Sequence, residues 1–345
     1  MVNERRIIYL DVARICAMFS VVILHVAAEG WYGFDIHSKE WAVYNAYYGF
    51  TRWGVPVFLM ISGALFLGRE KEITINSIFG KYIKRLVIAY VFWAIVYACK
   101  DVFIVGEVSF GSFLKTVVEG HYHMWYIPLI IGIYLLLPVL KELTKNDVVM
   151  YYLLLLLLFF YFVVPTIGLI PQLSGLYRIF DRILFSAFGG YGAYFLLGYF
   201  LNKVELKKTI RYLIYLLGLL GAVATALTTM IVSRQNGALY IDVNSGFMVN
   251  VLFTSVAIFV FAKYMCTDGR IHGSTCTVLA GLSESMFGVY LVHILVLELL
   301  EQIGISALKY ESLWTVLIIS FAVWLISLFV VLGIRQIPLL KKYIV

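Results

Sequence analysis

The chain has 345 residues, of which 62% are hydrophobic and only 14% are charged, whereas a soluble domain carries about 25% charged residues. This composition excludes an ordinary soluble domain and predicts an all-α integral membrane protein, in which the bilayer covers much of the apolar surface. The net charge of +7 does not indicate a nucleic-acid partner, because the basic residues follow a membrane topology.

Ten apolar runs are each long enough to cross a bilayer as a helix. The connections between them are short, so we expect one membrane domain, residues 1–345, and no soluble domain. The runs lie near residues 8–29, 49–67, 84–105, 124–140, 148–165, 183–201, 210–232, 247–265, 278–300 and 312–334.

Lys and Arg residues collect in every second connection. If the N-terminus is inside, 19 of the 27 fall in or beside the inner connections, and cytoplasmic connections carry an excess of Lys and Arg. Ten spans then bring the C-terminus inside as well. We therefore expect a multi-pass protein of the inner or plasma membrane, with both termini in the cytoplasm.

The first run contains a pair of ionisable residues, Arg14 and His25. In a helix, eleven residues make about three turns plus ~20°, so both side chains lie on one face, ~16 Å apart along the axis. Asp11 precedes Arg14 by three residues and can pair with it. Ionisable groups are costly inside a bilayer and by default mark a functional path. The alternative is an Arg14 that extends to the interface and a His25 that packs with a hydrogen bond.

The second run carries Arg52 near its outer end and the pair Ser62-Gly63 further in. Two such small residues allow the close approach of another helix or of a ligand. Pro56, between them and Arg52, leaves one backbone carbonyl without its usual helical partner. The run therefore has either a packing role or a binding role.

Lys81, Lys84 and Arg85 lie at the inner entry to the third run. Their i, i+3 and i+4 spacing places three cations on one helical face. They indicate either a positive-inside anchor on anionic lipid or a phosphate clamp. Neither a P-loop nor a dinucleotide-binding fingerprint accompanies them.

Three further polar groups lie at ends that are predicted to be outside. The connection 30–48 is rich in aromatic and polar residues, which is typical of an interfacial belt or of a surface that binds carbohydrate. His121-Tyr122-His123-Met124-Trp125-Tyr126 leads into the fourth run, and Tyr290 and His293 share a face of the ninth. Each histidine alone fits a packing role, but together the groups favour one outer site. Neither the histidines nor the four cysteines have metal-ligand spacing, so no metal is expected.

Taken in order, these motifs resemble the membrane-bound acyltransferase family 3. Arg14, ten residues and His25 fit the R/K-x10-H signature of that family's first helix, and Phe58 to Gly63 fit the F-x-x-x-S-G pattern of its second. The likeness covers essentially the whole chain and is greatest with stand-alone members that acetylate surface polysaccharides. The SGNH hydrolase domain that many members append is not expected here. Other similar elements are the basic run that ends at Arg85, the His123-Met-Trp125-Tyr126 helix start, and the segment from Ser283 through Tyr290 to His293.

The resemblance implies an O-acyltransferase that takes an acyl group, by default acetyl, from cytoplasmic acyl-CoA (acetyl-CoA) as co-substrate. The acceptor is then a hydroxyl of a surface glycan or lipid-linked sugar. A transporter or flippase for a glycolipid or small solute is the alternative, because the same polar residues would line a path, and a membrane sensor is a third reading. The resemblance implies that His25 is the general base and that Arg14 assists it. It implies that acyl-CoA is bound by Arg14, Lys81, Lys84, Arg85 and Ser62. It implies that the acceptor is bound by Arg52, His123, Trp125, Tyr126, Tyr290 and His293.

Overall fold

Every element that the structure describes is helical. The computed structural model describes residues 7–68, 73–105, 109–173, 189–267, 274–309 and 313–345, and no strand occurs among them. Eight helical segments are long and apolar enough to cross a membrane, and a ninth candidate is the pair Phe110–Leu135 and Leu137–Leu143, which is bent by 54°. The prediction of an all-α, multi-pass membrane protein is confirmed for this part of the chain.

The sixth predicted span, 183–201, begins outside the described residues. Its described part is helix α12 (Gly189–Lys203), which has 15 residues, fewer than the about 20 that a spanning helix needs. The orientation stays a prediction, and some of the basic residues behind it also lie outside the described residues: Arg5, Arg6, Arg69, Lys71, Arg178, Arg182 and Arg270.

Two segments that the sequence analysis treated as connections contain helices. In the first, α2 (Lys39–Phe50) starts where the Ser38 hydroxyl caps the Trp41 amide at 3.0 Å, as serine does at helix N-termini. Together with α3 (Gly54–Leu67) it forms one 29-residue candidate span. In the second, α6 (Phe110–Glu119) is capped by Ser109. The expected boundaries were wrong here because capping serines start helices inside polar segments.

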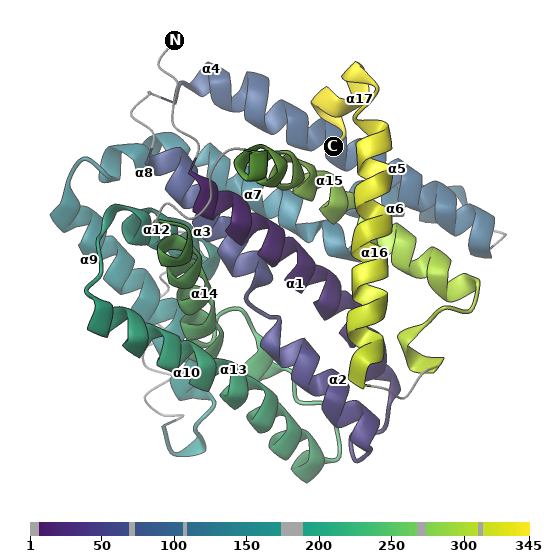
Figure 1. The fold of residues 1–345 in the computed structure, drawn as a ribbon, viewed down its shortest axis with the longest axis horizontal. Helices are drawn as coiled ribbons and strands as arrows, with labels where there is room; N and C mark the ends of the chain where they lie inside the picture. The colour runs from purple at the N-terminus through teal and green to yellow at the C-terminus, as the bar shows by residue number, and fades with distance from the viewer. Residues whose placement is uncertain (1–6, 69–72, 106–108, 174–188, 268–273, 310–312) are drawn as a thin grey trace. The chain divides into compact units, whose positions relative to one another are not determined.

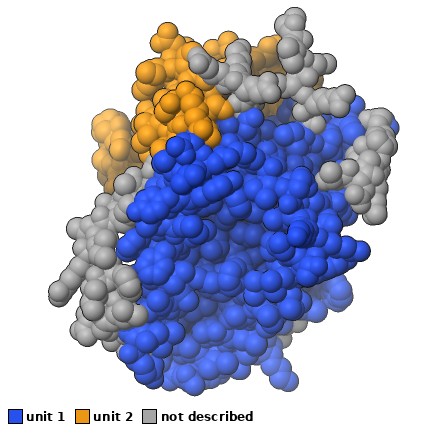
Figure 2. Space-filling view, turned by 90° about the vertical axis from the view of Figure 1, so that its left-hand side faces the viewer, with its two compact units in different colours: residues 1–69, 146–284, 305–321 blue, residues 70–145, 285–304, 322–345 orange. Residues whose placement is uncertain are grey.

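The helices form two compact units (Figure 2), and each is described by itself. The unit boundaries within the long helices fall between Glu284 and Ser285 and between Phe321 and Ala322. The assignment of a single domain stays a prediction. Unit 1 holds α1 (Ile8–Gly33), α2, α3, α9 (Asp147–Leu158), α10 (Val164–Gly168), α12, α13 (Lys208–Asn236), α14 (Val249–Thr267) and the first parts of α15 (Ser274–Gln302) and α16 (Leu313–Ile334). Unit 2 holds α4 (Ile75–Ser77), α5 (Lys84–Val105), α6, α7 (Tyr126–Leu135), α8 (Leu137–Leu143), the remainders of α15 and α16, and α17 (Pro338–Tyr343).

Short irregular turns connect or extend these helices. Two are π-helical, η1 (Ile78–Ile83) and η3 (Phe159–Val163), and they widen the helix locally. The others have 3-10 geometry: η2 (Tyr122–Trp125), η4 (Pro171–Leu173), η5 (Asp242–Asn244) and η6 (Ala307–Lys309).

In unit 1, helix α1 packs against α2, α3 and α14 (Figure 1). The approach of α3 is close, because a Cβ on Gly54 would lie 3.0 Å from the Ala17 carbonyl oxygen and 2.8 Å from a methyl of Val21. The Ser20 hydroxyl donates to the Thr51 carbonyl at 2.9 Å across the same contact. The glycine and this hydrogen bond therefore fix where α1 lies in the unit.

Helices α3 and α12 meet backbone to backbone. A Cβ on Gly63 would lie 1.7 Å from the Phe195 carbonyl oxygen, and one on Gly198 would lie 2.0 Å from that of Met60. Small residues at a crossing let two backbones reach this distance, which is how helices gain dispersion energy in a bilayer. The packing role expected for Ser62-Gly63 is confirmed for Gly63.

Helix α13 places its small residues inward and its large residues outward. Gly218, Gly221 and Ala222 are buried, while Leu216, Leu219 and Leu220 are exposed on the unit's surface. A soluble helix would have the opposite pattern, whereas lipid is as good a solvent for leucine as a protein core is. The exposed leucines therefore face lipid.

A buried lysine caps the C-terminal end of α12. Lys263 Nζ on α14 donates to the carbonyls of Leu201 at 3.1 Å, Asn202 at 3.2 Å and Val204 at 2.8 Å. The last carbonyls of a helix have no intrahelical donor, so the ammonium satisfies them and complements the helix dipole. Glu205, which is exposed, lies 3.0 Å from the same nitrogen, and the hydrogen bond from Lys263 lowers the pKa of its carboxyl.

We expect Gly63→Ala to destabilise the protein by about 1–3 kcal/mol, because the new methyl meets a backbone oxygen that cannot move without separating α3 from α12. The matched control is Gly132→Ala on α7, where a Cβ meets nothing within 4 Å and alanine improves helix propensity. Thermal unfolding in detergent measures both. Equal unfolding temperatures for the two variants would show that the crossing of α3 and α12 can accept a methyl group at Gly63.

We expect Lys263→Met to lower stability by about 1–3 kcal/mol, because it removes the donor of several buried carbonyls. Glu205→Gln removes only the exposed ion pair and should change the unfolding temperature little. If Glu205→Gln lowers the unfolding temperature as much as Lys263→Met does, the capping role is contradicted and the stabilisation comes from the ion pair.

Candidate functional site

Arg14 lies on α1 and is held by side chains of unit 1. Its Nη1 donates to the Ser283 hydroxyl on α15 at 2.9 Å and lies 3.8 Å from Asp11 Oδ1. The pairing with Asp11 predicted from the i, i+3 spacing is therefore confirmed. These two contacts orient the guanidinium within unit 1.

His25 follows on the same continuous helix, so the one-face placement of Arg14 and His25 is confirmed. His25 is half-buried, and Val22 and Val26 of the same helix are fully buried. One turn further, Glu29 Oε2 accepts a hydrogen bond from the Ser306 hydroxyl at 3.1 Å. A half-buried imidazole on a packed helix has the restricted freedom that a general base needs.

The basic segment departs from the regular helix on which its prediction rested. Lys81 lies in the π-helical turn η1, and α5 begins at Lys84, so the spacing of 3.6 residues per turn does not hold through Lys81. Arg85 Nη2 donates to the Val345 carbonyl at 2.8 Å. Lys81 and Lys84 are exposed, and both are accessible to an anion.

Arg52 and Ser62 both make contacts within unit 1. Arg52 Nε donates to the Asn244 carbonyl at 2.6 Å, and its guanidinium lies over the Tyr48 ring at 5.1 Å. The Ser62 hydroxyl donates to the Phe58 carbonyl of its own helix at 3.0 Å. Their predicted ligand contacts stay predictions.

Several aromatic residues of 30–48 pack inside unit 1, whereas Tyr32 is 64% exposed. Trp31 and Trp41 are fully buried, and Trp31 stacks on Tyr48 with ring centroids 4.3 Å apart. Trp31 Nε1 donates to Asn45 Oδ1 at 3.1 Å, and Asn45 Nδ2 donates to the Ala226 carbonyl on α13 at 2.8 Å. Trp31 and Trp41 therefore have a packing role, and the interfacial belt and the sugar-binding surface stay predictions for the exposed residues of the segment.

In unit 2 the structure brings together four predicted acceptor-binding residues. The Tyr290 hydroxyl donates to the His123 carbonyl at 2.6 Å, and His293 Nδ1 lies 2.7 Å from the Tyr290 carbonyl. A carbonyl only accepts, so His293 carries its proton on Nδ1. The His123 and His293 rings meet edge to face at 5.3 Å, and Tyr126 meets Tyr290 at 5.8 Å.

Trp125 differs from these neighbours, because its side chain is 45% exposed. Its indole is therefore available to lipid or to a ligand. The expectation that His25 and the groups of unit 2 share one outer site stays a prediction.

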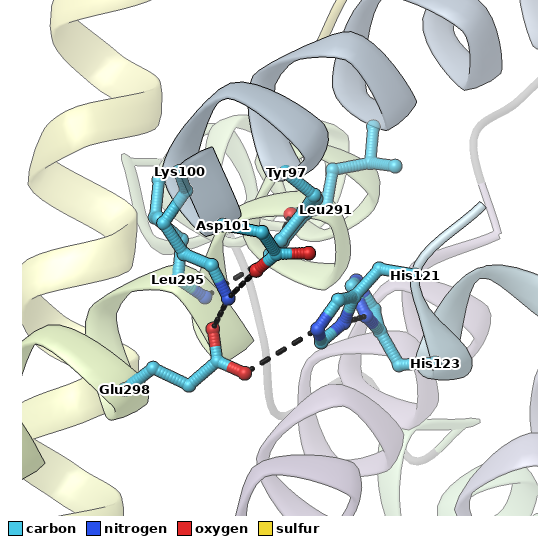
Figure 3. Close-up of polar contacts among 8 residues, drawn as sticks. All are labelled: Tyr97, Lys100, Asp101, His121, His123, Leu291, Leu295 and Glu298. Atoms are coloured by element: carbon cyan, nitrogen blue, oxygen red, sulfur yellow. Dashed lines mark hydrogen bonds and ion pairs between the residues drawn. The ribbon is translucent and has the colours of Figure 1, made fainter. Parts of the chain in front are cut away.

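Sequence reasoning missed a charged cluster around His121 in unit 2 (Figure 3). Glu298 Oε2 on α15 lies 2.7 Å from Lys100 Nζ on α5, and its Oε1 lies 3.3 Å from His121 Nε2. Lys100 also pairs with Asp101 at 2.9 Å, and His121 Nδ1 lies 3.0 Å from His123 Nδ1. The available signal was three ionisable residues, Lys100, His121 and Glu298, all at ends predicted to be outside. In the described part of the chain, no group of three or more His, Cys, Asp or Glu side chains is arranged to hold a metal ion.

Tyr97 fixes the ring of His121. The two rings stack with centroids 4.4 Å apart and planes at 17°. The Tyr97 hydroxyl donates to the Leu291 carbonyl at 2.9 Å and accepts from the Leu295 amide at 3.1 Å, so α15 holds the phenol at both its donor and its acceptor. Two positioned imidazoles next to a carboxylate can hold or move a proton.

A scan of the chain against family models finds one match that covers almost all of it. Residues 7–334 match the acyltransferase 3 model, which is described as an acyltransferase domain. No curated protein and no solved structure matches the chain in the corresponding comparisons. The match includes the Arg14–His25 helix, the basic segment and the histidines of unit 2. The chain therefore belongs to the acyltransferase 3 family and is a membrane acyltransferase.

Proposed function

We propose that the protein transfers an acyl group, acetyl by default, from acyl-CoA to a hydroxyl of a cell-surface or lipid-linked sugar. The observation that carries the proposal is the pair of ionisable residues Arg14 and His25 on one packed helix, α1, in a membrane acyltransferase. Within the family, the sequence resembles stand-alone members such as the enterobacterial common antigen O-acetyltransferase. That resemblance supports acetyl-CoA as donor and a surface polysaccharide as acceptor.

His25 acts in this proposal as the general base. A neutral imidazole takes the proton of the acceptor hydroxyl near pH 7 while the oxygen attacks the thioester carbonyl. The ester forms, the carbon–sulfur bond breaks, and CoA leaves as the thiol after the sulfur takes up a proton. Arg14 lies ~16 Å along the axis from His25, a span that the extended pantetheine arm of acyl-CoA can partly bridge.

We assign the binding of acyl-CoA to Arg14 and to the exposed Lys81 and Lys84. Asp11 and Ser283 orient the Arg14 guanidinium, which then presents its remaining donors to phosphate. Arg85 donates from Nη2 to Val345 and is exposed, so it too keeps donors for phosphate. This arrangement requires the predicted topology, with α1 and α5 starting on the cytoplasmic side.

The acceptor sugar is expected near the residues of unit 2 that the family resemblance selects, His123, Trp125, Tyr126, Tyr290 and His293, and near Arg52 of unit 1. The exposed indole of Trp125 offers a flat apolar face of the kind on which a sugar ring packs. The buried Tyr290 and His293 support His123 through the hydrogen bond and ring contacts described above.

Replacing His25 by alanine should lower kcat by about 10²–10⁴-fold, the usual contribution of a general base. The assay follows thiol release from radiolabelled acetyl-CoA and the label in envelope glycolipid. The control is His37→Ala, because His37 is exposed in the loop before α2. A His25→Ala protein with full activity would remove His25 from the chemistry, and acceptor transport without thiol release would favour the transporter.

The double variant Lys81→Gln/Lys84→Gln should raise the KM for acyl-CoA at least about tenfold and leave kcat nearly unchanged. Each charge-assisted hydrogen bond to phosphate is worth roughly 1.5–3 kcal/mol, and 1.4 kcal/mol is tenfold in affinity. The control is Lys145→Gln, whose ammonium is exposed and pairs with Glu142 at 2.6 Å. An unchanged KM would assign the two lysines to lipid anchoring.

A further inference from the structure

Helix α17 is attached to the first half of α5 within unit 2. The two helices pack against each other (Figure 1). Arg85 Nη2 donates to the Val345 carbonyl at 2.8 Å, and Trp93 Nε1 donates to the Ile344 carbonyl at 3.1 Å. The side chains of Ile344 and Val345 are buried. Two hydrogen bonds and two buried apolar side chains therefore fix the end of α17 on α5.

This attachment gathers basic residues from two distant parts of the chain. Lys84 and Arg85 begin α5, and Lys341 and Lys342 lie in the last turn of α17. The ammonium of Lys342, and more weakly that of Lys84, lowers the pKa of the Tyr343 phenol, so both ammonium groups lie near one hydroxyl. The four cationic side chains are exposed. We call them the α5–α17 basic surface: Lys84, Arg85, Lys341 and Lys342.

The α5–α17 basic surface has no carboxylate partner among the described residues. None of the ion pairs in that part of the chain includes its members, whereas Lys100, Lys115 and Lys145 of the same unit each have a carboxylate partner. Like charges that are held together repel each other, and a bound anion relieves the repulsion. Arg and Lys side chains are the usual partners of phosphate. The surface therefore fits a ligand that carries several phosphate charges.

The groups of this surface are held in place, which distinguishes it from a simple lipid anchor. The Arg85 guanidinium lies over the Phe287 ring at 5.7 Å and donates from one nitrogen to Val345. Its orientation is therefore set, while its other nitrogens keep donors. An anchor on anionic lipid needs only an excess of positive charge near the bilayer. Fixed donors favour a ligand whose phosphates have a fixed spacing, because little freedom is then lost on binding.

We propose that the α5–α17 basic surface binds the phosphates in the nucleotide part of acyl-CoA. In the predicted topology this surface lies on the cytoplasmic side, where acyl-CoA is available. Lys341 and Lys342 then bind the acyl donor in addition to the residues assigned above. The inference rests on the proposed use of acyl-CoA. It concerns binding by residues of unit 2 alone, and no bond forms or breaks in it.

The test measures the binding of radiolabelled acetyl-CoA to the full chain, purified in detergent without anionic lipid. Lys341→Gln/Lys342→Gln should raise the dissociation constant at least about tenfold, the loss expected for one charge-assisted hydrogen bond to phosphate. The matched control is Lys115→Gln, because Lys115 is an exposed lysine of α6 in the same unit, and it should leave the dissociation constant unchanged. An unchanged dissociation constant in the double variant would overturn the proposal.

Two competing ligands show which part of acyl-CoA the surface holds. Adenosine 3′,5′-bisphosphate carries phosphates without the thioester, and acetyl-pantetheine carries the thioester without phosphates. Lys341→Gln/Lys342→Gln should raise the inhibition constant of adenosine 3′,5′-bisphosphate at least about tenfold and leave that of acetyl-pantetheine unchanged. A general disturbance of the protein predicts equal rises for both competitors, and equal rises would overturn the proposal.

A conservative variant and an added lipid complete the test. Lys341→Arg/Lys342→Arg keeps both charges, so it must bind acetyl-CoA as the wild type does. Phosphatidylglycerol that raises the unfolding temperature of the wild type but not of Lys341→Gln/Lys342→Gln, with equal acetyl-CoA binding by both, would make the surface a lipid anchor and overturn the proposal. A wild-type protein that binds no acetyl-CoA would overturn the proposed function itself. Binding by the wild type that the glutamine variant does not weaken would overturn only this inference.

Discussion

Helices in a bilayer gain little from hiding apolar side chains from each other, because lipid tails are equally apolar. Their association depends instead on how closely two backbones approach and on hydrogen bonds between them. Unit 1 follows this constraint at the crossing of α3 and α12, where Gly63 and Gly198 each leave less room than one methyl group requires. The contact of α13 with α14 repeats it, because a Cβ on Gly221 would lie 2.4 Å from the Asn250 carbonyl oxygen.

The glycine contacts also explain why α1 is suited to carry chemistry. Helix α3 is fixed against α12 on one side, and through Gly54 it lies against Ala17 and Val21 of α1 on another. The helix with Arg14 and His25 is therefore positioned in part by a close contact with α3 at Gly54. A base placed on such a helix has few alternative positions, and precise placement accounts for much of the rate enhancement in bimolecular transfer.

Sequence reasoning succeeded where a relation lies within one element. The shared face of Arg14 and His25 and the pairing of Asp11 with Arg14 follow from helix periodicity alone. It failed where a partner comes from elsewhere in the chain: Ser283 is 269 residues from Arg14, and Glu298 is 198 residues from Lys100. Periodicity cannot supply such pairs, so Lys100 looked like a topology signal only. The burial of Trp31 and Trp41 could not be foreseen for a related reason, because it depends on partners such as Asn45, which bonds to α13.

Lys263 and Lys100 show two ways in which an ammonium group is held inside the protein. Lys263 donates to three backbone carbonyls at the end of α12, groups that need a donor in any fold of this kind. Lys100 is bound instead by two carboxylates, Asp101 and Glu298. Replacing such a buried ionic group with well-packed apolar residues is often neutral or stabilising, so stability does not explain why the cluster is ionic. The second oxygen of Glu298 lies 3.3 Å from His121 Nε2, so one carboxylate orients both the ammonium of Lys100 and the imidazole of His121.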